Sequence, residues 1–482
     1  MSQLEGDSIL VEETAIFGHC SYPIHQIFEP LDNGGNFPEP GVACPVGRCL
    51  CRTFDRRGES NANPPSQDAF YAVPQEGLST AAPGSILRHR APPSPIAAFT
   101  LVPLKLKDSH QILYRTNDNK GNPTATVLTV LVPFNASYDK VVSFQPAQDS
   151  ACPDCAPSYA LQRSSATGGF LGTFLSQLEL LIVEAVLENG YIVVIPDHEG
   201  PHAAFLANRM AGQATLDGVR AALNSASFTG IHKDAKIAIW GYSGGSLATS
   251  WAAELQPTYA PELKINGAIL GGLVPNITTV IRSVNNSTSC GILPSGAFGL
   301  AHEYPYIADF LSKHILPQYR DDFYKAETQC LVASILQFRN KNALAMFDDP
   351  KVFFTDPGVV SIFDENRVGQ LAPKIPLYVY KSASDELSPV GETDAVVQGY
   401  CARGTRVQYL RDIVSDHTTL AGLGAPKVLS WIHDIMEGVQ LPPGCTTKTV
   451  TTSLWDTATL RFVPKAIVDA ILDLLGKPVG PL

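Results

Sequence analysis

The fold of this chain is decided by residues 236–246, which read KIAIWGYSGGS. The short apolar run 236–240 follows a polar turn, as expected for a buried central strand of a parallel sheet. Residues 241–245 fit the G-x-S-x-G nucleophile elbow, in which a serine lies at a sharp turn between a strand and a helix. This pattern also occurs by chance in loops rich in glycine and serine. The strand before it and the helix predicted over 246–255 favour a true elbow.

Strands and helices alternate on both sides of the elbow. This alternation predicts a mostly parallel, doubly wound α/β sheet. The expected strands are 82–87 (a turn into a strand), 97–106, 111–116, 125–132, 140–145, 191–196, 236–240, 265–271, 375–380 and 406–410. The expected helices outside the elbow are 174–188, 212–223, 306–314, 326–338, 425–436 and 466–475.

The pattern of predicted strands and helices divides the chain into four regions. Residues 1–66 are irregular, 67–272 form the first part of the α/β core, and 372–482 form its second part with a C-terminal tail. Residues 273–371 contain several helical stretches and no clear strand, so we expect a helical cap over the site. The N-terminal extension contains Cys20, Cys44, Cys49 and Cys51, but their spacing is not that of a zinc site. A disordered or disulfide-tied extension is the preferred interpretation.

Composition limits the function and the compartment. A net charge of −11 argues against binding of nucleic acid or of anionic membranes, and no apolar run is long enough to span a bilayer. The first thirteen residues lack the features of a signal peptide. Ten cysteines and the sequons at Asn135, Asn276, Asn285 and Asn286 nevertheless favour a secreted protein whose true start is missing. The alternative is an intracellular relative of secreted proteins.

A serine nucleophile needs a base and an acid that orients the base. Asp385 follows the strand 375–380, and His417 is expected on the loop after the strand 406–410. The order Ser243, Asp385, His417 is the one expected after such an elbow. Glu386 is the rival acid. The other histidine of the C-terminal part is His433, which lies within a predicted helix.

The tetrahedral intermediate of acyl transfer needs hydrogen-bond donors for its oxyanion. The backbone N–H of Gly244 is the first candidate, because it follows the nucleophile. The second donor should come from the loop after an earlier strand, which favours Asp197 in the sequence Asp197-His198-Glu199-Gly200. Asp197 could act through its backbone N–H or through a protonated carboxyl. The alternative interpretation is a structural polar corner.

These motifs together resemble those of the fungal secretory lipases of the lipase A type. The resemblance covers residues 68–482. Besides the elbow and the Asp197, Asp385 and His417 segments, it rests on residues 83–87 (PGSIL), 155–160 (CAPSYA), 216–220 (LDGVR) and 259–263 (YAPEL). Residues 1–66 have no counterpart that we recognise in this family.

The resemblance implies an α/β-hydrolase fold with a helical cap that hydrolyses carboxylic esters through an acyl-enzyme. It implies that Ser243, Asp385 and His417 form the triad and that Asp197 and Gly244 bind the oxyanion. It also implies disulfides between Cys155 and Cys330 and between Cys401 and Cys445, and it leaves Cys152 and Cys290 without partners. We expect a lipid or small-molecule ester substrate, contact of the cap with a lipid surface, a monomer, and no metal or cofactor.

Three alternatives to a lipase or esterase stay open. A secondary-metabolite deacetylase or an acyltransferase would use the same triad, with an alcohol in place of water in the transferase. A serine peptidase on the same fold would read a substrate amine, for which Asp197 and Glu199 are candidates. A non-catalytic binding protein should have a broken triad, whereas Ser243, Asp385 and His417 are all present.

Overall fold

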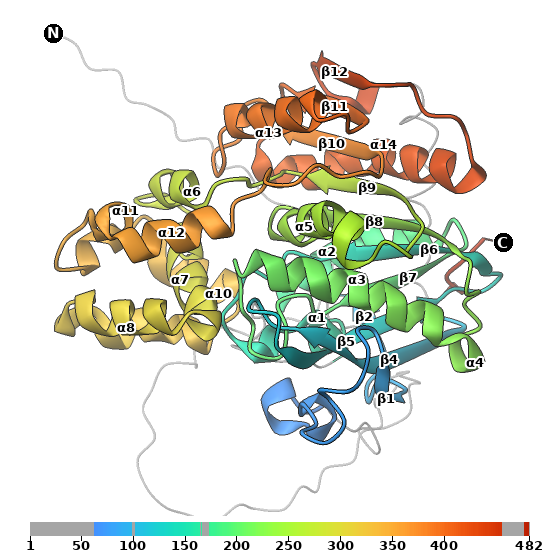
Figure 1. The fold of residues 1–482 in the computed structure, drawn as a ribbon, viewed down its shortest axis with the longest axis horizontal. Helices are drawn as coiled ribbons and strands as arrows, with labels where there is room; N and C mark the ends of the chain where they lie inside the picture. Colours follow the sequence, from blue (N-terminus) through green and yellow to red (C-terminus); the bar gives the residue numbers. More distant parts are fainter. Residues whose placement is uncertain (1–61, 99–101, 164, 166–172, 456–476, 482) are drawn as a thin grey trace, which may run out of the picture. The chain divides into compact units, whose positions relative to one another are not determined.

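The elbow strand β8 lies near the middle of a ten-stranded sheet, which is counted over the described residues only (Figure 1). This computed structural model describes residues 62–98, 102–163, 165, 173–455 and 477–481. These residues fall within one unit, Gly58–Leu482. Most of the irregular extension 1–66 and the helix expected at 466–475 therefore lie outside the described residues.

The sheet has the spatial order β1-β4-β5-β7-β6-β8-β9-β10-β11-β12. All neighbouring pairs from β7 to β12 are parallel, whereas the pairs β1–β4, β4–β5 and β5–β7 are antiparallel. The strands are β1 (Ile86–Arg90), β4 (Asp108–Asn117), β5 (Pro123–Val132), β6 (Ser137–Gln145), β7 (Tyr191–Pro196), β8 (Lys236–Tyr242), β9 (Ile265–Gly271), β10 (Leu377–Ser382), β11 (Val407–Asp412) and β12 (Cys445–Val450). The predicted mostly parallel α/β sheet is confirmed.

Helices cover both faces of this sheet. Because side chains alternate along a strand, Ile237 and Ile239 of β8 enter one core with helices α3 and α5. Ala238 and Trp240 enter the core on the other face, with α2 and α14. The helices outside the segment between β9 and β10 are α1 (Pro157–Ala160), α2 (Phe174–Leu187), α3 (Asn208–Asn224), α4 (Ala226–Thr229), α5 (Gly244–Tyr259), α13 (Val390–Ala402) and α14 (His417–Glu437).

The segment between β9 and β10, residues 272–376, contains no strand of the sheet and is called the cap here. Its aromatic and aliphatic side chains form a separate hydrophobic core. Figure 1 shows its helices beside one edge of the layered core. They are α6 (Ile277–Val284), α7 (Ile292–Glu303), α8 (Pro305–His314), α9 (Arg320–Tyr324), α10 (Leu331–Phe338), α11 (Val352–Thr355) and α12 (Pro357–Glu365). None of the helices in the described residues is both long and apolar enough to span a membrane.

Two predicted elements differ from the structure in this part of the comparison, and one strand was not predicted. The strand expected over 97–106 is replaced by the short pair β2 (Ala97–Ala98) and β3 (Val102–Pro103), where proline lacks a ladder donor. The helix expected over 326–338 begins only at Leu331, after Cys330 has entered a disulfide with an extended backbone. Strand β12 was missed because its sequence, CTTKTV, is polar and almost wholly exposed.

Candidate active site

Ser243 lies in a strained turn between β8 and α5. Its backbone has φ 52° and ψ −120°, a conformation that residues other than glycine rarely adopt. Its N–H donates to the carbonyl of Gly271 on β9 at 2.9 Å. A Cβ at Gly245 would lie 1.8 Å from the carbonyl oxygen of Gln145, and one at Gly241 would lie 2.1 Å from that of Gly245. The glycines are therefore required by the close approach of helix and strands.

Ser243, His417 and Asp385 form a continuous hydrogen-bonded chain. His417 Nε2 lies 2.8 Å from Ser243 Oγ, and His417 Nδ1 lies 2.6 Å from Asp385 Oδ2. The two ring nitrogens thus contact the hydroxyl and the carboxylate at the same time. This is the geometry that lets an imidazole take the serine proton while a carboxylate orients the ring.

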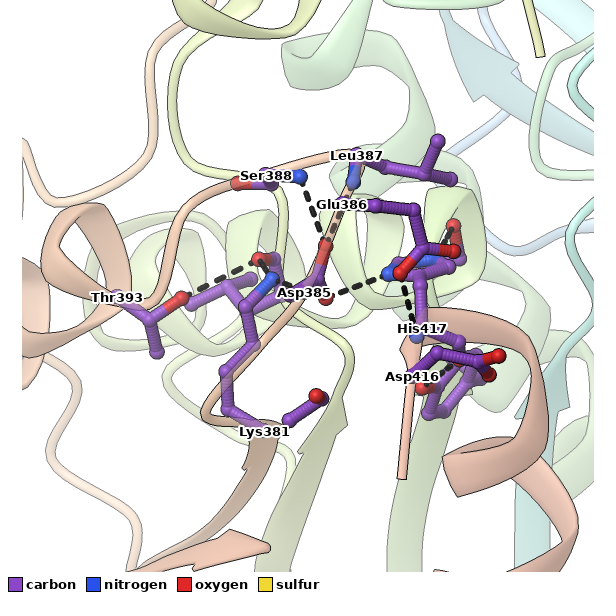
Figure 2. A network of polar contacts seen from close by, with 12 residues as sticks. Lys381, Asp385, Glu386, Leu387, Ser388, Thr393, Asp416 and His417 are labelled. Carbon is purple, nitrogen blue, oxygen red and sulfur yellow. Dashed lines mark hydrogen bonds and ion pairs between the residues drawn. The ribbon is translucent and has the colours of Figure 1, made fainter. Parts of the chain in front are cut away.

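Asp385 is held as a carboxylate by several donors (Figure 2). The backbone N–H groups of Leu387 and Ser388 donate to its Oδ1 at 3.0 and 2.8 Å. Lys381 Nζ lies 2.8 Å from its Oδ2. Burial raises the pKa of Asp385, but His417 and Lys381 outweigh this effect and lower it to about 2. The acid is therefore ionised over the range in which histidine titrates.

His417 is the first residue of α14, so the expectation that it lies on a loop is wrong. Asp416 caps this helix and forms a capping box with Thr419. The rival acid Glu386 accepts the backbone N–H of His417 at 2.9 Å, which anchors the residue without contacting the ring. His433 lies near Tyr191 instead, with 3.3 Å between its Nδ1 and the phenol oxygen.

Asp197 is not placed beside Ser243, so its predicted oxyanion role does not fit the structure. Its strand β7 is separated from β8 by β6. Its N–H donates to the carbonyl of Val127 at 2.8 Å. Its carboxyl accepts hydrogen bonds from the N–H and the hydroxyl of Ser158 at 2.8 and 2.5 Å. The alternative interpretation, a structural polar corner, describes these contacts.

The loop that reaches Ser243 from a neighbouring strand follows β6 and carries Asp149. This residue has φ 48°, and a Cβ at Gly244 would lie 1.7 Å from its Oδ1. The carboxyl is buried, and its Oδ1 has no hydrogen-bond partner among the described residues. Burial raises the pKa of Asp149 to about 7. The sequence signal for Asp149 is its place just after the core strand β6. It was not predicted because it does not lie in a cluster of charged residues, as Asp197 does.

An apolar cavity, called the tunnel here, is lined by Ser243 and by side chains of the cap. The residues that line it come from the core and from α6, α7, α8, α11 and α12, and Asp149 and Ser243 are the polar side chains among them. They are Asp149, Phe205, Leu206, Ser243, Gly244, Leu247, Val274, Ile277, Val280, Ile281, Val284, Ile292, Leu293, Gly296, Ala297, Leu300, Ile307, Phe353, Phe363 and Leu387. Its lining suits an apolar group attached to a carbonyl that lies at Ser243.

Two disulfides brace the regions around the site. Cys155 is joined to Cys330, which ties the loop after β6 to the cap. Cys401 is joined to Cys445, which ties α13 to β12 across the segment that contains His417. Cys152 and Cys290 are buried and form no disulfide with any described residue. No group of three potential metal ligands occurs in the part of the chain that the structure describes.

Comparisons with known proteins show the family of this chain. Residues 164–443 match the family profile described as secretory lipase. Lipase A of Arthroderma benhamiae is 47% identical over 420 residues, which cover 87% of this chain and 89% of that protein. The chain belongs to the secretory lipase family. Lipase 5 of Candida albicans is 40% identical over 79% of this chain and 83% of that protein.

A solved lipase structure has a similar fold. The X-ray structure of Candida antarctica lipase A in its closed state matches with a TM-score of 0.76 and 26% identity, over 88% of this chain and 99% of that one. This family member therefore has an α/β-hydrolase fold and is a carboxylic ester hydrolase. Its membership in a secretory family and the two disulfides of its described residues are consistent with secretion.

Proposed function

We propose that this secretory lipase cleaves carboxylic esters through an acyl-enzyme formed on Ser243. The observation that carries the proposal is the continuous contact from Ser243 Oγ through His417 to Asp385, at 2.8 and 2.6 Å. His417 takes the proton of Ser243 as Oγ attacks the ester carbonyl, and then gives it to the leaving alcohol. Water repeats the cycle on the acyl-enzyme and releases the acid.

Asp149 and Gly244 are the proposed donors to the oxyanion. Gly244 is the first residue of α5, where backbone N–H groups have no partner within the helix. Asp149 cannot use its own N–H, because that group donates to Glu199 Oε1 at 3.0 Å. Its side chain can donate only while it is protonated, and its raised pKa keeps the proton on the carboxyl below about pH 7. This assignment replaces the one first made for Asp197.

The apolar tunnel favours long acyl chains over acetyl groups. It is lined by side chains from several cap helices, so much of its length lies beyond the reach of an acetyl group. Each buried methylene of an acyl chain contributes about 0.8 kcal/mol. The proposed substrate is therefore an ester of a long-chain fatty acid, which separates this protein from a metabolite deacetylase on the same triad.

The test is hydrolysis of p-nitrophenyl esters from acetate to palmitate by the wild type and by Ser243→Ala. We expect the variant to lose activity while its fold is unchanged by circular dichroism, and the wild type to prefer the long esters. Equal activity in both proteins would contradict the role of Ser243. A preference for acetate would contradict the acyl-chain assignment alone. Transfer of the acyl group to an added alcohol in preference to water would favour an acyltransferase.

We also propose that the protein is secreted and carries N-linked glycans. Of the four sequon residues, Asn135 and Asn286 are exposed, although Asn135 Nδ2 donates to the Pro481 carbonyl at 2.9 Å. Asn276 caps α6, and Asn285, which is half-buried, hydrogen-bonds to Asn342. The exposed pair are therefore the proposed glycan sites. Removal of glycans by an amidase should lower the mass of protein from a fungal culture, and peptide mapping should find the modification at these two positions. Unmodified peptides at both would contradict the proposal.

A further inference from the structure

A lysine lies at a fully buried position beside the proposed triad acid. Lys381 is on β10, and Figure 2 shows its side chain directed at Asp385. Its Nζ lies 2.8 Å from Asp385 Oδ2, and neither side chain has any exposed surface. The same oxygen lies 2.6 Å from His417 Nδ1. A single oxygen atom therefore stands between the ammonium group and the imidazole.

Stability alone is a poor explanation for this lysine. Lysine is almost never fully buried, and a buried ion pair often contributes no more than an apolar pair of the same volume. The preceding positions of β10, Tyr378, Val379 and Tyr380, are buried and largely apolar, so a neutral side chain would suit the strand. Burial lowers the pKa of Lys381, although the Asp385 carboxylate opposes this shift. A buried ammonium group is therefore energetically unfavourable at this position, which lies beside the proposed reacting groups.

The other titratable groups around Asp385 and His417 are acids. Glu386 follows Asp385, Asp416 precedes His417 on α14, Tyr242 of β8 donates to the His417 carbonyl, and Asp149 faces the elbow from the loop after β6. Each of these groups stabilises a protonated imidazole if it is ionised. Among the described groups that face the triad, Lys381 supplies the positive charge that opposes them.

We propose that Lys381 is a positioning residue whose buried charge offsets Asp385 and so extends the activity of the Ser243–His417 pair to lower pH. The base in a triad works only while its imidazole is unprotonated. A full, unopposed carboxylate at 2.6 Å would stabilise the imidazolium and stop catalysis at a higher pH. Lys381 shares that carboxylate oxygen and weakens this effect. The inference rests on the proposed triad and adds the pH range over which it operates.

Lys381 has a second contact that an experiment must separate from its charge. Its Nζ donates to the carbonyl of Leu273, at the start of the cap, at 2.8 Å. Thr393 Oγ1 of α13 donates to the same carbonyl at 3.2 Å and is also fully buried. Thr393→Val therefore removes a hydrogen bond to Leu273 without touching the charge at Asp385. It is the matched control for Lys381.

The experiment measures the pH dependence of kcat/KM for a p-nitrophenyl ester in the wild type, Lys381→Met, Lys381→Gln and Thr393→Val. Methionine removes the charge and the donors, whereas glutamine keeps an N–H donor without the charge. The acid limb is the part of the profile in which kcat/KM falls as the pH is lowered. We expect the midpoint of this limb to move to a higher pH by about one unit or more in both lysine variants. Thr393→Val should keep the wild-type limb. The glutamine variant also serves if methionine prevents folding.

An acid limb that stays in place in a folded Lys381 variant would overturn this inference. An equal shift in Thr393→Val would also overturn it, because the effect would then come from the cap carbonyl. A shift in the methionine variant but not in the glutamine variant would assign the effect to a hydrogen bond and reject the charge. Ser243→Ala separates the two proposals. If that variant is active, the triad fails, whereas an unmoved limb with an inactive Ser243→Ala rejects only the role of Lys381.

Discussion

At the scale of single residues, the partners of two buried acids near Ser243 decide which of them carries a proton. Burial raises the pKa of Asp385, but its contacts with His417 and Lys381 outweigh this effect and lower the pKa to about 2. Asp149 is buried without such partners for Oδ1, so its pKa rises to about 7. Two buried aspartates near the same serine can thus take opposite roles, one as a permanent anion and the other as a neutral donor.

This contrast predicts the behaviour of two substitutions at Asp149. Asp149→Ala removes the proposed oxyanion donor and should lower kcat by roughly 100- to 1000-fold, whereas Asp149→Asn keeps an N–H donor and should retain most of the activity. In the wild type the donor is lost as the pH rises through about 7, so activity should fall on the basic side. The asparagine variant should lack this fall. A pH profile of kcat for the three proteins checks this, and an unchanged kcat in Asp149→Ala would rule out the role.

At the scale of elements, the elbow depends on one backbone contact between α5 and β6. A Cβ at Gly245 would lie 1.8 Å from the carbonyl oxygen of Gln145, and neither backbone can move without breaking the sheet. We expect Gly245→Ala to lower the free energy of unfolding by about 3 kcal/mol or more. Urea denaturation measures this loss. A stability equal to that of the wild type would show that the elbow can relax.

A glycine in helix α14 is expected to respond to an alanine substitution in the opposite way, with a higher free energy of unfolding. Gly422 lies on the exposed side of α14, with no atom within 4 Å of the position of a Cβ. Gly422→Ala should therefore stabilise the protein by up to about 1 kcal/mol, because alanine favours the helix. The two substitutions add the same methyl group, so denaturation of both separates the contact in the elbow from a general effect of removing glycine.

The same scale shows what the sequence could predict. The bounds of β7 and β9 were predicted because short apolar runs ended by glycine or polar clusters are strong local signals. Local sequence could not show whether the loop after β6 or the loop after β7 lies beside Ser243. It depends on the sheet order, in which β6 and not β7 lies next to β8. Asp197 was chosen for its polar neighbours, and the role of Asp149 became visible only from that order and its positive φ.

His417 shows a second limit of local patterns. The helix that it begins was expected only from residue 425, because Gly422, Gly424 and Pro426 discourage a helix. In the structure Gly424 accommodates the ring of Tyr380, so the helix runs through this stretch to reach His417. The histidine proposed as the base could be selected from its order in the chain. Its position at a capped helix start required the tertiary contact.

At the scale of the whole molecule, the two disulfides hold different parts of the chain together. The Cys155–Cys330 bond spans 175 residues and joins core to cap, and the Cys401–Cys445 bond spans 44. In the chain-entropy treatment, removal should cost about 5 kcal/mol for the first and about 4 kcal/mol for the second. We expect the double serine variant of the first pair to melt at the lower temperature. Calorimetry of both double variants checks the order, and a reversed order would contradict it.

The tunnel exists only because the cap lies over the elbow, so acyl-chain selection belongs to the whole molecule. Ala297 of α7 is buried and lines the tunnel, and a phenylalanine there would occupy the path of a long chain. We expect Ala297→Phe to lower kcat/KM for palmitate at least tenfold relative to acetate, which corresponds to about 1.4 kcal/mol. Ala301→Phe is the control, because Ala301 lies on the same helix but not among the residues that line the tunnel. Its chain-length preference should match the wild type. Parallel losses for acetate and palmitate in Ala297→Phe would place the acyl chain elsewhere.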